Sequence, residues 1–176
     1  GDSRRDVEAL HRTTAFRRTI GRVFERRAFT ARCRCSRERV GTGPRATLAD
    51  VRNAYRIGHA YQATLTRYER SSILQKAAVL LRARAEQAST LITLESGLCK
   101  KDSMYEIGRV ADVLVFGANE ALRDDGQVFS CDLTPHGKKR KVITTREPLL
   151  GVITAITPFN HPMNQVAHKV VPSVAT

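Results

Sequence analysis

The feature that most constrains the fold is a strand–loop–helix pattern at the end of the chain. Residues 151–156 (Gly-Val-Ile-Thr-Ala-Ile) are a short apolar run typical of a buried strand. Residues 157–162 (Thr-Pro-Phe-Asn-His-Pro) follow as a tight loop, and Pro162 suits the first position of a helix. A strand followed by a helix opens a parallel α/β sheet. Because a parallel strand needs neighbours, we expect an α/β chain truncated at Thr176.

Three helical patterns precede this unit. They cover residues 48–62, a stretch up to Gly97 with a break near residue 85, and a stretch that fades at 124–126. Each begins with a pair spaced as a capping box, in which a hydroxyl side chain and an acid three residues later satisfy exposed N–H groups. The pairs are Thr47–Asp50, Thr66–Glu69 and Ser103–Glu106. β-prone residues around the turn at 135–138 then predict a hairpin over 127–147.

The first forty residues differ from the rest. They hold 12 Arg, no Lys and 5 acidic residues, a net charge of +7 of the chain's +13. The breaker-rich stretch 41–46 marks a boundary, and residues 1–43 are predicted to be a disordered segment. One reading is a basic nucleic-acid-binding tail, with Phe16, Phe24 and Phe29 available to stack on bases. The other is a foreign or frame-shifted leader without function of its own.

Composition limits the remaining classes. Hydrophobic residues make up 41% of the chain, and no apolar run reaches the length of a membrane span. Cysteines stand at 33, 35, 99 and 131, and this spacing is poor for a zinc site. The N-terminal region lacks the apolar segment that a signal peptide would need. We therefore expect a cytoplasmic protein with reduced thiols, no metal and no membrane partner.

The C-terminal motifs resemble the aldehyde dehydrogenase superfamily. The matching stretches are 146–153 (Arg-Glu-Pro-Leu-Leu-Gly-Val-Ile), 156–162, Lys169 with Pro172, 94–97 (Leu-Glu-Ser-Gly) and Glu106. The likeness covers residues 44–176, whereas residues 1–40 do not fit the family. It implies three parts: a helical part of the cofactor-binding domain over 44–126, a hairpin of the oligomerisation element over 127–147, and the first strand–loop–helix of the dinucleotide-binding sheet over 148–176.

The resemblance also implies an activity. Members oxidise aldehydes with NAD or NADP and form homo-oligomers. The family's nucleophilic Cys, its general-base Glu and most of its cofactor site would follow Thr176, so we expect the chain to be inactive alone. A remnant that associates with full-length subunits through residues 127–147 is a further alternative.

Site residues follow from the matched motifs. Asn160 would donate a hydrogen bond to the developing oxyanion, although from the sequence alone it could instead cap the helix that starts at Pro162. The strand end beside the nicotinamide and ribose would be Ile156, Thr157, Pro158 and Phe159.

The substrate tunnel would be lined from two helices. Its residues would be Arg109, His161, Asn164, Gln165 and His168, with Met163, Val166, Ala167 and Val170 forming the opposite, apolar face of the last helix. Arg109 and His161 together predict a cationic pocket for a small polar or anionic aldehyde. The loop sequence looks most like phosphonoacetaldehyde dehydrogenases of phosphonate metabolism, with lactaldehyde and non-phosphorylating glyceraldehyde-3-phosphate dehydrogenases as close rivals.

Overall fold

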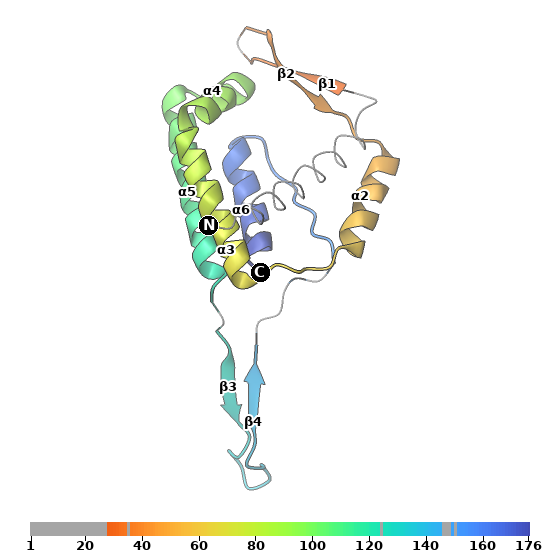
Figure 1. Ribbon diagram of the computed structural model, residues 1–176, viewed down its shortest axis with the longest axis vertical. Helices are drawn as coiled ribbons and strands as arrows, with labels where there is room; N and C mark the ends of the chain where they lie inside the picture. The colour runs from red at the N-terminus through yellow and green to blue at the C-terminus, as the bar shows by residue number, and fades with distance from the viewer. Residues whose placement is uncertain (1–27, 35, 124, 146–148, 150) are drawn as a thin grey trace, which may run out of the picture. The chain divides into compact units, whose positions relative to one another are not determined.

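The computed structural model describes residues 28–34, 36–123, 125–145, 149 and 151–176 (Figure 1). The chain divides after Tyr61 into two compact units. The predictions for residues 1–27, including stacking by Phe16 and Phe24, lie outside the described residues.

The first unit contains a hairpin and a helix. Strands β1 (Ala28–Arg32) and β2 (Arg39–Pro44) pair antiparallel, with Thr30 opposite Thr42 and a register shift after Ala31. Helix α2 (Leu48–Ala60) begins at the predicted capping box of Thr47 and Asp50. Residues 1–43 are predicted to be disordered, but the described part of this segment forms β1 and most of β2. Strand β2 contains Gly41, Gly43 and Pro44, residues that usually interrupt strands, so the stretch predicted as a boundary instead pairs with β1.

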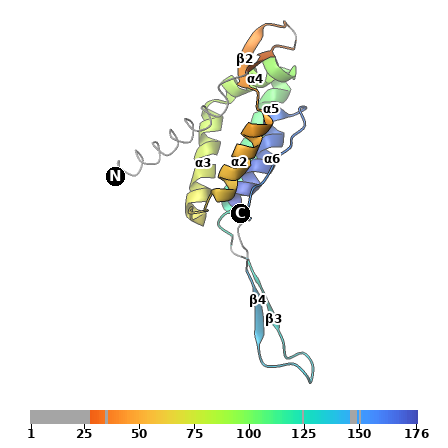
Figure 2. The same cartoon turned by 90° about the vertical axis from the view of Figure 1, so that its right-hand side faces the viewer.

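The second unit is built on α3 (Arg67–Ala83), α4 (Ala85–Ser96), α5 (Lys100–Glu120) and α6 (Pro162–Ala175). Helices α3, α5 and α6 lie side by side (Figures 1 and 2), and α5 packs on both of the others. Their contact faces form one apolar core rich in small residues: Leu74, Val110, Ala118, Ala121, Ala167, Val171 and Ala175. Small side chains let the helix backbones approach closely.

Local signals set most of the helix ends. Thr66 and Glu69 form the predicted capping box of α3, the break falls at Arg84, and Gly97 ends α4 with a left-handed φ of 81°. The third predicted box is wrong. Helix α5 begins at Lys100, so Ser103 and Glu106 lie in its interior, where both are buried. The same residue spacing that caps a helix start can also occur within a helix that began one turn earlier.

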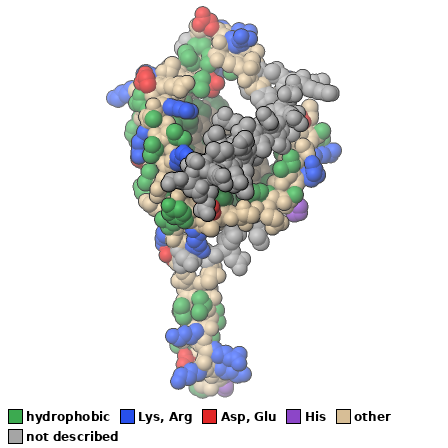
Figure 3. Space-filling view, in the orientation of Figure 1, with side chains coloured by type: hydrophobic (Ala, Val, Ile, Leu, Met, Phe, Trp, Pro, Cys, Tyr) green, Lys and Arg blue, Asp and Glu red, His purple; other side chains and the backbone are tan. Residues whose placement is uncertain are grey.

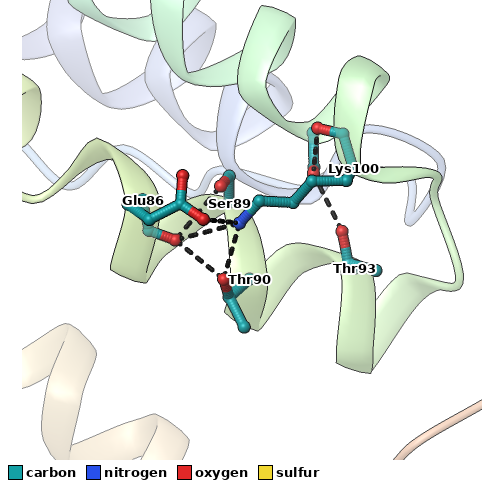
Figure 4. Close-up of polar contacts among 6 residues, drawn as sticks. Glu86, Ser89, Thr90, Thr93 and Lys100 are labelled. Atoms are coloured by element: carbon teal, nitrogen blue, oxygen red, sulfur yellow. Dashed lines mark hydrogen bonds and ion pairs between the residues drawn. The ribbon is translucent and has the colours of Figure 1, made fainter.

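Side-chain hydrogen bonds and an ion pair join α4 to the start of α5 (Figure 4). The Lys100 ammonium lies 2.7 Å from the Glu86 carboxylate and donates to the Thr90 hydroxyl at 2.6 Å. One turn further along α5, the hydroxyls of Ser103 and Thr93 are 2.9 Å apart. Ser103 is therefore a contact between the two helices rather than a cap.

The predicted second hairpin is confirmed. Strands β3 (Gln127–Ser130) and β4 (Lys141–Thr144) pair antiparallel, and every residue in them is exposed. Figure 3 shows basic side chains gathered over the hairpin tip, where residues 138–141 read Lys-Lys-Arg-Lys.

The strand predicted over 151–156 is not formed. A strand requires a hydrogen-bonded neighbour, and no described segment pairs with these residues. Val152, Ile153 and Ile156 are exposed as a result. Both sheets in the described residues are two-stranded and antiparallel.

Candidate active site at the start of helix α6

A buried carboxylate joins α5 to the first turn of α6. One oxygen of Glu106, Oε1, accepts hydrogen bonds from the backbone N–H groups of Met163 at 2.8 Å and Asn164 at 2.9 Å. The Glu106 residue is only 1% exposed, so these bonds replace its contacts with water. Removing a carboxylate from water is costly, and two N–H donors at the positive end of a helix offset that cost.

The sequence around Pro162 explains why α6 needs this contact. Pro162 occupies the first turn and has no N–H, and the N-cap residue, His161, makes no side-chain capping bond. The N–H groups of Met163 and Asn164 are therefore left without a local acceptor. Glu106 supplies the acceptor from another helix.

The structure pairs His161 with Glu106. His161 Nδ1 lies 3.5 Å from Glu106 Oε2, and the His161 side chain is 40% exposed. Arg109 lies on α5 one turn after Glu106 and is exposed. The predicted convergence of Arg109 and His161 on an anionic group stays a prediction.

Asn160 precedes this junction and is exposed. The alternative role as a helix cap is not realised, because His161 takes the N-cap position. Asn160 makes no hydrogen bond to the part of the chain that the structure describes. Its amide is thus available to a ligand.

The residues before Asn160 form an open apolar surface. Ile156 is 80% and Phe159 is 87% exposed, Pro158 is exposed, and Thr157 is partly buried. Phe159 is therefore not part of the apolar core.

Helix α6 is rotated relative to the predicted faces. Asn164 is buried together with Ala167, Val171 and Ala175, while Gln165 is partly buried and His168 is exposed. The expected apolar face is largely open: Met163, Val166 and Val170 are between 36% and 44% exposed. The bonds from Glu106 fix the start of the helix so that Asn164 turns towards α5. The residues predicted to form one polar wall therefore differ in exposure: Asn164 is buried, whereas His168 is exposed.

Sequence reasoning treated Glu106 as a cap and a motif residue and missed its contact with α6. One signal was available. Glu106 lies within the apolar stripe that includes Ile107 and Val110, and a lone acid in such a stripe needs a buried partner.

With this geometry in place, the comparisons identify the family. The aldehyde dehydrogenase family profile matches residues 24–176, and the chain belongs to this family. The match begins twenty residues before the predicted boundary at residue 44, so it takes in the hairpin of β1 and β2.

Particular relatives have named substrates. The chain is 39% identical over 120 residues to aspartate-semialdehyde dehydrogenase 1 of Pseudomonas canavaninivorans, covering 68% of this chain and 25% of that protein. It is 37% identical over 131 residues to 3-sulfolactaldehyde dehydrogenase of Priestia megaterium, covering 74% and 27%.

A solved structure agrees with the fold. NADP-dependent glyceraldehyde-3-phosphate dehydrogenase from Bacillus halodurans, complexed with NADP, superposes with a TM-score of 0.71 at 31% identity. The alignment covers 86% of this chain and 33% of that one. The chain thus spans between a quarter and a third of these three proteins.

No helix among the described residues is both long and apolar enough to cross a membrane. The same residues contain no group of three His, Cys, Asp or Glu side chains placed to hold a metal ion.

Proposed function

We propose that this chain is the N-terminal part of an NAD(P)-dependent aldehyde dehydrogenase that oxidises a small anionic aldehyde, such as phosphonoacetaldehyde, to its acid. The observation that carries the proposal is the exposed Asn160 amide, which directly precedes the start of α6, where Glu106 accepts the N–H groups of Met163 and Asn164. Family membership supports the reaction class.

Asn160 would stabilise negative charge on the substrate oxygen. Addition of a thiol to an aldehyde leaves charge on the carbonyl oxygen, and a fixed amide N–H beside a helix N-terminus suits that charge. Asn160 can serve in this way because neither capping nor burial uses its side chain.

Arg109 is the better of the two predicted cations for an anionic substrate group. It is exposed, whereas His161 has the Glu106 carboxylate within ion-pair distance. The named substrates of the three similar proteins support an anionic aldehyde, because they carry a carboxylate, a sulfonate or a phosphate. Gln165 and His168 would complete the polar lining, while Asn164 would act through packing.

The exposed residues Ile156, Pro158 and Phe159, together with the partly buried Thr157, would cover one side of a nicotinamide cofactor. Their open apolar surface fits a flat ring, and the NADP bound to the Bacillus halodurans structure supports this assignment. The bound cofactor would accept hydride from the substrate. These residues can only form part of its site.

The β3–β4 hairpin would join subunits of a homo-oligomer. Four large apolar residues of the hairpin are each at least 50% exposed: Val128, Phe129, Val142 and Ile143. Such a group of exposed apolar side chains is unusual on a monomeric protein. Association with full-length subunits through this element stays a prediction, as do nucleic-acid binding by the Arg-rich segment and a cytoplasmic location.

A chimera tests the function. Residues 24–176 would be joined to the C-terminal part of the Pseudomonas canavaninivorans relative and assayed with aldehydes and either cofactor. Asn160→Ala should lower kcat roughly 100- to 1,000-fold, the cost of losing one oxyanion donor. Asn119→Ala, at an exposed position of α5, is the control. A folded but inactive chimera, or equal kcat for the Asn160→Ala chimera, would contradict the proposal.

A further inference from the structure

Glu106 contacts the chain on both sides of Pro162. On the helix side, Oε1 binds the N–H groups of Met163 and Asn164. On the loop side, Oε2 faces His161 Nδ1 at 3.5 Å, and His161 directly follows Asn160. One buried side chain therefore fixes the point where the Asn160 loop becomes a helix.

The loop has little else to hold it. Residues 155–160 make no hydrogen bonds to the described part of the chain, and all except Thr157 are exposed. The Oε2 atom is buried and has no hydrogen-bond partner among the described residues. It faces the His161 ring at the end of the loop. Without Glu106, the two amides of α6 would lose their acceptor and the loop would lose its attachment to α5.

We infer that Glu106 is a positioning residue: it replaces the missing cap of α6 and thereby sets the place of the Asn160 amide. The role in turnover rests on the proposed function. The role in fixing the first turn of α6 does not, and the two can be measured separately.

The first measurement uses the 176-residue chain. Amide hydrogen exchange at Met163 and Asn164 would be followed by NMR in the unaltered chain and in Glu106→Ala, Glu106→Gln and Glu95→Gln. Loss of a charged acceptor should speed exchange roughly 10- to 150-fold in Glu106→Ala. Glu106→Gln keeps an acceptor oxygen of the same reach and should show a smaller increase. Glu95, exposed on α4, is the matched control.

Equal exchange at both amides in Glu106→Ala and the unaltered chain would overturn the inference. If Glu106→Ala fails to fold, Glu106→Gln decides, because an unchanged rate in that folded variant would show that the charge does not hold these amides.

The second measurement uses the chimera. Glu106→Gln should lower kcat per folded enzyme by a similar factor for anionic and neutral aldehydes, with little change in KM. A purely structural role would lower the yield or the melting temperature and leave kcat of the folded enzyme unchanged, which would overturn the positioning role. If Asn160→Ala also has no effect, the proposed function fails, while the exchange result at α6 still stands.

Discussion

Glu106 and Asn164 lie 58 positions apart in the sequence, and the Glu106 carboxylate accepts the Asn164 N–H at 2.9 Å. Both residues are buried, at 1% and 3% exposure. The bond uses only the backbone of Asn164, and its side-chain Oδ1 is buried without a partner among the described residues. A buried carbonyl oxygen in this state lowers stability, because its lost contacts with water are not replaced.

The first prediction concerns that side chain. Asn164→Leu should leave the free energy of unfolding unchanged or raise it, because it replaces an unpaired polar group with an apolar one of similar size. Asn164→Asp should lower it by about 3 kcal/mol or more, since it places a second carboxylate in a buried site beside Glu106. Thermal unfolding of the three proteins at neutral pH measures both effects. A clear loss in Asn164→Leu would reveal a hydrogen bond to the amide.

The second prediction concerns the approach of α5 to α6. A Cβ placed on Gly117 would collide with the Val171 side chain, which is buried in the core. Overpacking of this kind costs about 1–3 kcal/mol, against a gain of about 1 kcal/mol in helix propensity. Gly117→Ala should therefore lower the free energy of unfolding.

Gly108→Ala is the matched control on the same helix. Nothing lies within 4 Å of its added Cβ. It should raise the free energy of unfolding by about 0.5–1 kcal/mol through helix propensity alone. Equal effects of the two substitutions in denaturant unfolding would show that the packing at Val171 relaxes without cost.

The contrast between local and distant contacts explains what the sequence could predict. The capping boxes at Thr47 and Thr66 depend on residues three positions apart, so their pattern is visible in the sequence. The contact of Glu106 with α6 crosses nearly sixty positions, and no local pattern contains it. The strand expected over 151–156 depends on a pairing partner, which an apolar run does not specify.

The third prediction concerns acid. The backbone N–H and the hydroxyl of Thr66 both donate to the Glu69 carboxylate, at 2.8 and 2.9 Å, and hold its pKa below the ordinary value of 4.5. Because folding lowers the pKa of Glu69, the ionised carboxylate stabilises the folded protein at pH values above its ordinary pKa. This contribution to the free energy of unfolding is lost as the pH falls through the pKa of the folded state.

Glu69→Gln should therefore melt below the unaltered protein at about pH 6, and the difference should shrink towards about pH 3. Circular dichroism melts at both pH values check this. A difference that stays constant with pH would mean that the Glu69 charge does not contribute to the cap.

The last prediction concerns recognition of the substrate's charge. Arg109 is exposed one turn beyond Glu106 and has no ion-pair partner in the described part of the chain. In small aldehydes, the anionic group and the carbonyl are only a few bonds apart, so an anchor must lie near the Asn160 amide. Arg109 meets this condition if the helix carrying it borders the tunnel, as we propose.

Losing a charged contact typically costs about 1.5–3 kcal/mol, so Arg109→Met in the chimera should reduce kcat/KM roughly 10- to 150-fold for an anionic aldehyde. The loss should be small for a neutral aldehyde such as propionaldehyde. His161→Gln should affect the two substrates alike, because His161 faces Glu106 and acts on the loop. Equal losses on both substrates in Arg109→Met would assign Arg109 to the fold. A selective loss in His161→Gln would instead make His161 the anchor of the anionic group.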